Sequence, residues 1–103
     1  MSRRLQLHEV LVGLLGSRNV YFQPPSTFKM NYPCVVYSFG ETNFKTNFAN
    51  GILYNFRKVY KVTVIDSNSD TQIPDLLLNL PYCRWERYFL ADNLNHYVFT
   101  LHY

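Results

Sequence analysis

Charged residues are scarce in this chain: 17% of its 103 residues are Asp, Glu, Lys or Arg, whereas 48% are hydrophobic. Disordered chains have the opposite balance, so the composition predicts a folded protein. At this length we expect residues 1–103 to form a single domain. The net charge of +3 is too small to indicate nucleic-acid binding by itself. A solvated strand face explains cations such as Lys61, Arg84 and Arg87 more simply than phosphate contacts do.

Cysteine, glycine and long apolar runs are scarce as well. The two cysteines, Cys34 and Cys83, each begin a strand-like segment. No signal peptide precedes them, so we expect two buried thiols and no disulfide. The four glycines are scattered, which leaves no phosphate-binding loop. The apolar runs are too short to span a bilayer, and we therefore expect no membrane association.

Residues suited to catalysis do not form a recognisable pattern. The three histidines show no ligand spacing, and nothing in the local sequence supports a nucleophile pair between Cys34 and one of them. Three aspartates near residue 70 could suggest a metal site, but turn and helix-cap roles explain them more economically. We predict no enzyme activity, no metal and no cofactor. The residues concerned are His8, His96, His102, Asp66, Asp70 and Asp75.

Aromatic residues, by contrast, are abundant, with nine Tyr, eight Phe and one Trp. Tyr in particular favours surfaces that become buried against a partner. Two interpretations stay open. The large side chains either fill the core of a small domain, or part of them forms a subunit interface, because a domain of this size buries only a limited share of its surface.

Hydrophobic periodicity predicts two helices. The first covers residues 5–15, with leucines recurring on one face. The second covers roughly residues 72–80, and its buried face is predicted to be Leu76, Leu77 and Leu80. Both helices are amphipathic, so each is expected to pack one face against a sheet.

Strand-like segments supply that sheet. Residues 19–22 form a short piece that can only be an edge strand or a connector, because two prolines follow. The chain ends in a predicted β-hairpin whose turn contains Asp92, Asn93 and Asn95. The predicted fold is α+β, a largely antiparallel sheet of four to five strands covered by two helices, in the order α-β-β-β-α-β-β. The remaining predicted strands are residues 34–39 and 53–65, joined as an extended hairpin.

The tip of that extended hairpin, residues 40–54, is unusual. Asn50-Gly51 is a strong reverse-turn dipeptide, yet Phe44 and Phe48 are large and apolar. Either these two side chains fold back onto the core, or they insert into a neighbouring subunit.

Several segments carry a family resemblance. They are YKVTVID at 60–66, NSD at 68–70, IPDLL at 73–77, RYFLADNLNH at 87–96, FTLHY at 99–103, YPCVVY at 32–37 and NFANG at 47–51. Through them, most of residues 30–103 resembles the small tail-completion, or tail-terminator, proteins of long-tailed bacteriophages. The family's fold, a sheet covered by two helices, agrees with the predicted order of elements.

The resemblance implies a structural protein of the virion, assembled in the bacterial cytoplasm. Six copies would form a ring that caps the tail tube, ends its growth and presents a surface to the head. DNA would pass through the ring lumen without sequence recognition. A head-side connector or stopper is the alternative within the same neck. The predicted contacts with a neighbouring subunit or the tube are Phe44, Lys45, Phe48, Asn50, Gly51 and Tyr54.

Overall fold

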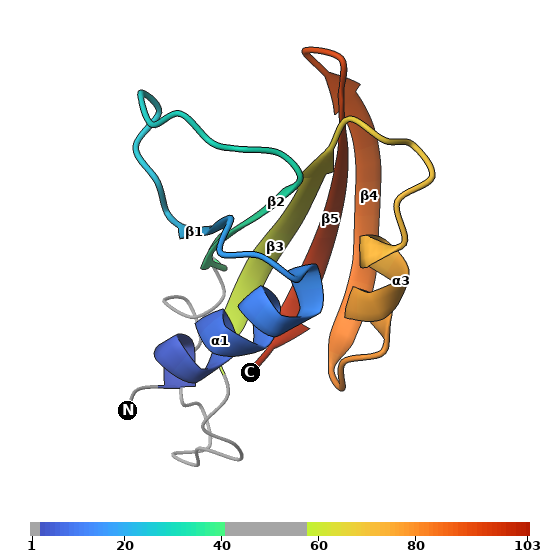
Figure 1. Cartoon of the computed structure of the whole chain (residues 1–103). Helices are drawn as coiled ribbons and strands as arrows, with labels where there is room; N and C mark the ends of the chain where they lie inside the picture. The colour runs from blue at the N-terminus through green and yellow to red at the C-terminus, as the bar shows by residue number, and fades with distance from the viewer. Residues whose placement is uncertain (1–2, 41–57) are drawn as a thin grey trace.

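The computed structural model describes residues 3–40 and 58–103, which form two helices and five strands (Figure 1). The order of elements and the α+β class are those predicted from the sequence. In chain order the elements are α1 (Arg3–Leu15), β1 (Val20–Phe22), β2 (Cys34–Phe39), β3 (Val59–Asp66), α3 (Ile73–Leu78), β4 (Cys83–Ala91) and β5 (Leu94–His102).

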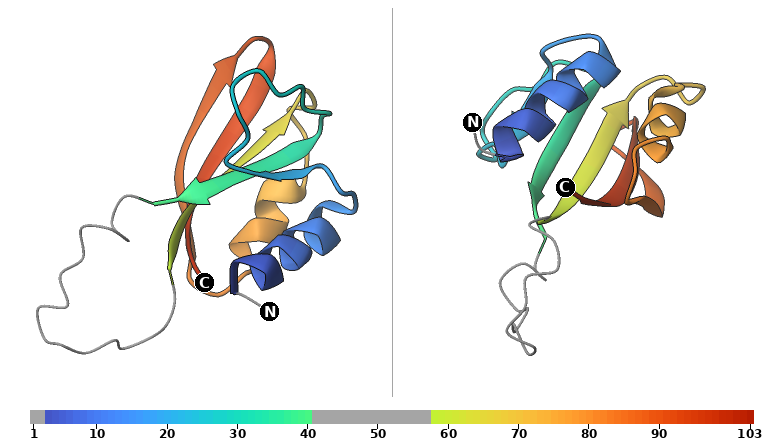
Figure 2. Two further views of the ribbon diagram at one scale, coloured as in Figure 1. Left: turned by 90° about the vertical axis from the view of Figure 1, so that its left-hand side faces the viewer. Right: turned by 90° about the horizontal axis from the view of Figure 1, so that it is seen from below.

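The strands form one mainly antiparallel sheet in the order β1-β2-β3-β5-β4. Only β1 and β2 run parallel, and β1 is the short edge strand that the following prolines predict. The pairing of Cys34 with Ile65 and of Phe39 with Tyr60 confirms the β2–β3 hairpin. Its predicted tip lies outside the described residues. Both helices cover the same face of the sheet, and we call the other side the open face (Figure 2).

The core lies between the helices and the covered face. Leu7 and Leu11 of α1 and Leu77 of α3 are fully buried there. The prediction that Leu76 is also buried is wrong, because its side chain is 44% exposed. The six-residue α3 turns Ile73 and Leu77 toward the core, and Leu80, two residues after the helix, packs on the same core; this rotates Leu76 outward. The sheet contributes Val35, Tyr37, Tyr60, Val62, Val64, Phe99 and Leu101.

Local hydrogen bonds explain where the helices end and begin. Gly16 has a φ of 81° and donates its N–H to the carbonyl of Val12 at 2.9 Å, as expected for a glycine that ends α1. Before α3, the Asp66 carboxylate accepts a hydrogen bond from the N–H of Asn68 at 3.0 Å. The Thr71 hydroxyl accepts one from the N–H of Ile73 at 3.4 Å. These bonds form the turns predicted from the composition of this segment. The predicted helix-cap role is not confirmed, because Gln72 at the start of α3 makes no side-chain cap hydrogen bond.

The terminal hairpin turns at Asp92 and Asn93, with φ values of 54° and 61°. This part of the prediction is confirmed, since such residues tolerate left-handed conformations. Asn95 was predicted in the same turn but belongs to β5 and is only 6% exposed. Its Nδ2 donates to the carbonyl of Asp66 at 3.0 Å, and its Oδ1 accepts from the Tyr88 hydroxyl. These bonds explain how an amide can be buried at a strand position.

Within residues 3–40 and 58–103, no helix has the length and apolar character needed to cross a membrane.

Candidate functional site

The six residues predicted to contact a neighbouring subunit or the tube lie outside the described residues, so their role stays a prediction. The described residues that flank this segment, Gly40 and Lys58, both lie at one margin of the sheet. Gly40 donates its N–H to the carbonyl of Val59 at 2.8 Å, and Lys58 donates to the carbonyl of Tyr103 at 3.0 Å. The predicted residues are Phe44, Lys45, Phe48, Asn50, Gly51 and Tyr54.

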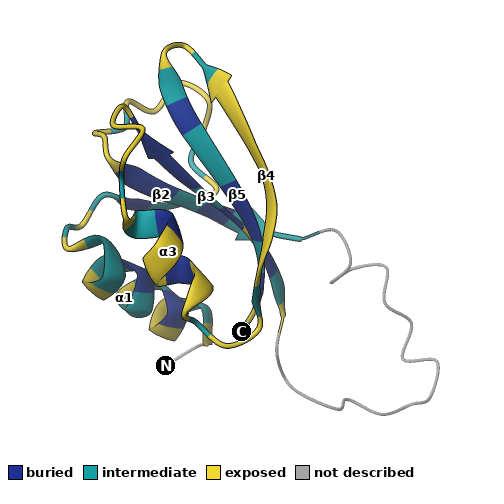
Figure 3. Cartoon of the chain, turned by 90° about the vertical axis from the view of Figure 1, so that its right-hand side faces the viewer, coloured by how far each residue is buried: buried dark blue, intermediate teal, exposed yellow. Residues whose placement is uncertain are grey.

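The described residues offer a different candidate, the edge strand β4. It pairs with β5 on one side, and no other described strand pairs with its outer side. Every residue from Arg84 to Leu90 is exposed, so burial hardly changes along the strand (Figure 3). A nine-residue edge leaves a row of backbone N–H and C=O groups that can pair with another chain. The opposite edge, β1, has only three residues.

Large side chains project from β4 on the side that carries the helices. Trp85 is 45% exposed, Tyr88 47% and Leu90 63%, and we call these three residues the aromatic edge. On the same side of the sheet, α3 exposes Leu76 and Leu78. Exposed apolar side chains that gather in one region, rather than singly, are typical of a surface that binds another protein.

The aromatic edge is held in place by its neighbours in β5. Trp85 packs edge-on against Phe99, with ring centroids 5.5 Å apart. Tyr88 packs against Tyr97 at 5.1 Å, and its hydroxyl donates to Asn95. These contacts fix both rings before any partner binds, so little side-chain entropy would be lost on association.

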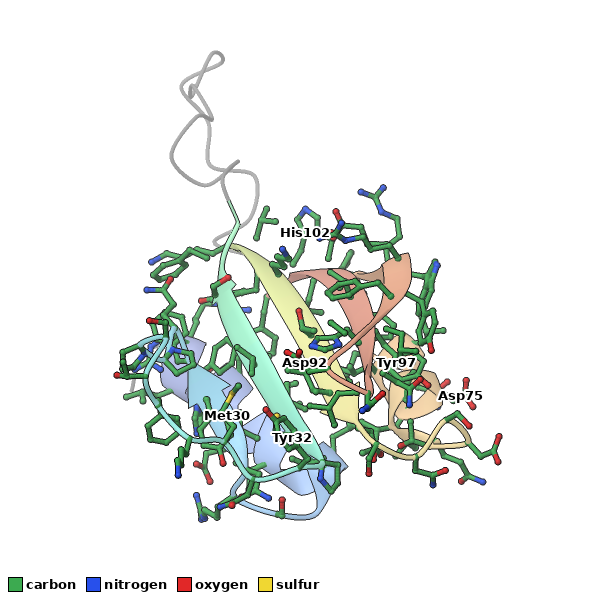
Figure 4. The ribbon with its side chains drawn as sticks, turned by 90° about the horizontal axis from the view of Figure 1, so that it is seen from above. Met30, Tyr32, Asp75, Asp92, Tyr97 and His102 are labelled. Atoms are coloured by element: carbon green, nitrogen blue, oxygen red, sulfur yellow. The ribbon has the colours of Figure 1, made fainter. Side chains whose placement is uncertain are left out.

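A second, chemically different surface lies on the open face. Lys61 of β3 and Arg84 of β4 both stand beside Thr100 of β5 in one cross-strand row. Together with Arg87 and His102 they line a hollow of about 540 Å³, which we call the basic hollow. Figure 4 places His102 on the side away from the helices, whereas Tyr97 lies on the side of α3.

A β-bulge brings two of these cations together. The register of β4 against β5 shifts between Trp85 and Arg87, so that Arg84 stands opposite Thr100 and Arg87 opposite Val98. Residues three apart on a regular strand would point to opposite faces. The extra residue in the bulge places both arginines on the open face. No glycine marks the bulge, and periodicity in the sequence could not have revealed this cluster.

The thiols and the part-buried histidine are not arranged for chemistry. Burial, with a smaller effect of Asp66, raises the pKa of Cys34 to about 12, and burial raises the pKa of Cys83 to about 11. Both thiols are therefore protonated and weakly nucleophilic near neutral pH. Both are free, as predicted, although Cys83 is only half-buried rather than buried.

His8 Nδ1 lies 2.8 Å from the Tyr37 hydroxyl, and burial lowers the pKa of this histidine.

The described part of the chain contains no group of three or more His, Cys, Asp or Glu side chains placed to hold a metal ion. Comparison of the chain with protein-family models, curated proteins and solved structures found no match. The two surfaces of the sheet, the aromatic edge and the basic hollow, are the candidate sites that the described residues offer.

Proposed function

We propose that this protein is a structural component of a long-tailed bacteriophage. In this proposal it forms a ring at the head-proximal end of the tail tube, ends polymerisation of the tube and helps to join the tail to the head. The observation that supports this role best is the exposed edge strand β4 with its fixed aromatic side chains. A protein that acts by self-assembly needs such a surface more than it needs a pocket.

A closed ring requires two different surfaces on each copy, because neighbouring subunits meet head to tail. The aromatic edge provides one, since Trp and Tyr side chains carry a large share of the binding energy in many interfaces. We expect the second to include Phe44 and Phe48, which the sequence predicts at an interface. Backbone groups of β4 can add hydrogen bonds to the same contact.

The expected partners follow from this role. They are other copies of the chain, as a ring of six, the last ring of tail-tube protein, and a head-side connector or stopper. DNA passes through the lumen without sequence recognition, and the protein resides in the tail or neck of the virion. The alternative role, a head-side connector or stopper in the same phage class, needs a similar self-associating surface.

The decisive experiment is electron microscopy of particles made by a phage whose copy of this reading frame is disrupted. Over-long tubes without heads are the expected result, since nothing would end polymerisation. Tails of normal length that fail to join filled heads would reject the terminator role and assign the protein to the head side. Intact infectious particles would reject the structural role altogether.

Complementation with point variants then tests the aromatic edge. Leu90→Glu places a charge at its most exposed member, and we expect this variant not to restore normal tails. Gln6→Glu makes the same charge change at an exposed position of α1 and should restore them. Thermal unfolding of both purified variants shows whether each is folded. Equal restoration by the two variants would contradict a role for β4 in assembly.

A further inference from the structure

We propose that the basic hollow binds the phosphate backbone of duplex DNA without reading its sequence, through Lys61, Arg84 and Arg87. This inference rests on the proposed function, in which DNA passes the protein without sequence recognition, and it names the side chains that would contact that DNA. DNA binding by the basic hollow requires no ring, so it can be tested on the free protein. It also revises the expectation from the sequence, in which these cations were simply a solvated strand face.

The spacing of the three cations suits separate phosphates. Lys61 and Arg84 flank Thr100 in one row, and paired strands lie roughly 4.8 Å apart, so their backbones are about 10 Å apart. Arg87 stands opposite Val98, two residues further along β5, a displacement of about 7 Å. Long side chains projecting from points roughly 7–12 Å apart can reach different phosphates on one duplex, whose major groove is about 12 Å wide.

The charge around the hollow is mainly positive. Its one carboxylate is Glu86, whose Oε2 accepts a hydrogen bond from the Thr100 hydroxyl at 3.3 Å. The single ion pair within the described ranges joins Arg18 to Glu9, well away from this face. The three cations of the hollow are thus not paired with a described carboxylate. The described aspartates belong to the opposite end of the strands, to the β4–β5 turn and to the segment from β3 into α3: Asp66, Asp70, Asp75 and Asp92.

The chemistry of the hollow favours DNA over a protein or a small molecule. Centres of protein interfaces are poor in charged residues, and small-molecule pockets are mostly apolar. The charged side chains of this lining are three cations, Lys61, Arg84 and Arg87, and one carboxylate, Glu86. The apolar side chains suited to a protein partner, Trp85 and Tyr88, lie on the other face of the same strand. The open face carries one exposed aromatic side chain, Phe89, which stacks on His96 and lies 5.1 Å from the Arg87 guanidinium. The cations beside it are the donors that contact phosphate oxygens.

The test is fluorescence anisotropy with a labelled 30-base-pair duplex in two unrelated sequences, over a series of salt concentrations. Three phosphate contacts predict that log K falls against log[salt] with a slope of about −2.7, roughly a 40-fold loss between 50 and 200 mM salt. Both sequences should bind equally. Removing two contacts with Lys61→Gln plus Arg84→Gln should reduce the slope to about −0.9, roughly a 3- to 4-fold loss over the same range.

A matched control removes the same net charge elsewhere. Arg18→Gln plus Lys29→Gln neutralises one exposed cation between α1 and β1 and another in the loop after β1, and its slope should remain near that of the unmodified protein. If the double variant of the hollow does not fold, Arg87→Gln alone should still make the slope shallower by about 0.9.

Three results would overturn the proposal. They are no binding at the lowest salt, equal weakening by the two double variants, and preference for an acidic polypeptide such as polyglutamate over the duplex. The last would identify an acidic protein as the occupant. These outcomes are independent of tail length in the electron micrographs, so failure of DNA binding and failure of the ring proposal can be distinguished.

Discussion

Two adjacent leucines of α3 provide a strong test of how this helix packs. Leu77 is fully buried in the same core cluster as Leu7 and Leu11, whereas the side chain of Leu76 is 44% exposed. Leu77→Ala removes buried methyl and methylene groups and leaves a cavity, which costs about 2–5 kcal/mol of unfolding free energy. Leu76→Ala removes groups that water already reaches, so we expect a loss below about 1 kcal/mol.

The difference should be large in thermal unfolding. For a domain of this size, 1 kcal/mol corresponds to a shift in Tm of about 4–8 °C. A loss of about 3 kcal/mol for Leu77→Ala therefore predicts a Tm lower by roughly 12–24 °C, against less than about 8 °C for Leu76→Ala. Trp85, the only tryptophan, packs on the core residue Phe99 and offers a fluorescence signal for urea and thermal unfolding.

Equal losses for the two variants, or a larger loss for Leu76→Ala, would refute the placement of α3. The measurement should be repeated at several protein concentrations, because Leu76 lies on the side of the sheet that carries the aromatic edge. If copies associate there, the apparent Tm depends on concentration, and the effect of Leu76→Ala would then include lost association.

Two further predictions concern buried polar groups. Burial raises the pKa of Cys34 from 9.0 to about 12, so above pH 9 the folded state keeps a thiol proton that the unfolded state loses. The contribution of this thiol to the free energy of unfolding is therefore complete below pH 9 and is lost as the pH rises toward 12. Urea unfolding should therefore show wild type losing about 1 kcal/mol more than Cys34→Ala between pH 7.5 and pH 10, and parallel losses would contradict this. Asn95→Ala should cost about 1–3 kcal/mol, because it leaves the carbonyl of Asp66 without its donor. Tyr88→Phe should cost less unfolding free energy than Asn95→Ala. A double-mutant cycle measures the coupling between the two side chains, and a coupling near zero would show that the Tyr88–Asn95 hydrogen bond is absent in solution.

Local features were predictable from the sequence because local interactions determine them. Leucine spacing placed α1, and the prolines after residues 19–22 indicated that β1 could only be an edge strand or a connector. Asp92 and Asn93 predicted the terminal turn for the same reason, since their side chains tolerate a positive φ. Propensity and periodicity are sufficient where the structure depends on residues close in the chain.

The candidate surfaces were less predictable, because they depend on residues far apart in the chain. The interface predicted at residues 44–54 lies outside the described residues, and neither β4 as the exposed edge nor the basic hollow was predicted. The position of β5 between β3 and β4 brings Lys61 and Arg84 into one row, and no local pattern contains that pairing.

The amino-acid sequence by itself thus determined the order of the elements, the buried leucine face of α1 and the turn at Asp92 and Asn93. Only the tertiary structure decided that Asn95 is buried, that Leu76 is exposed and that Arg84 and Arg87 share a face. The physical reason is the same in each case. Strand order, the bulge in β4 and the rotation of α3 are set by packing between distant segments, and that packing overrides the local period of the chain.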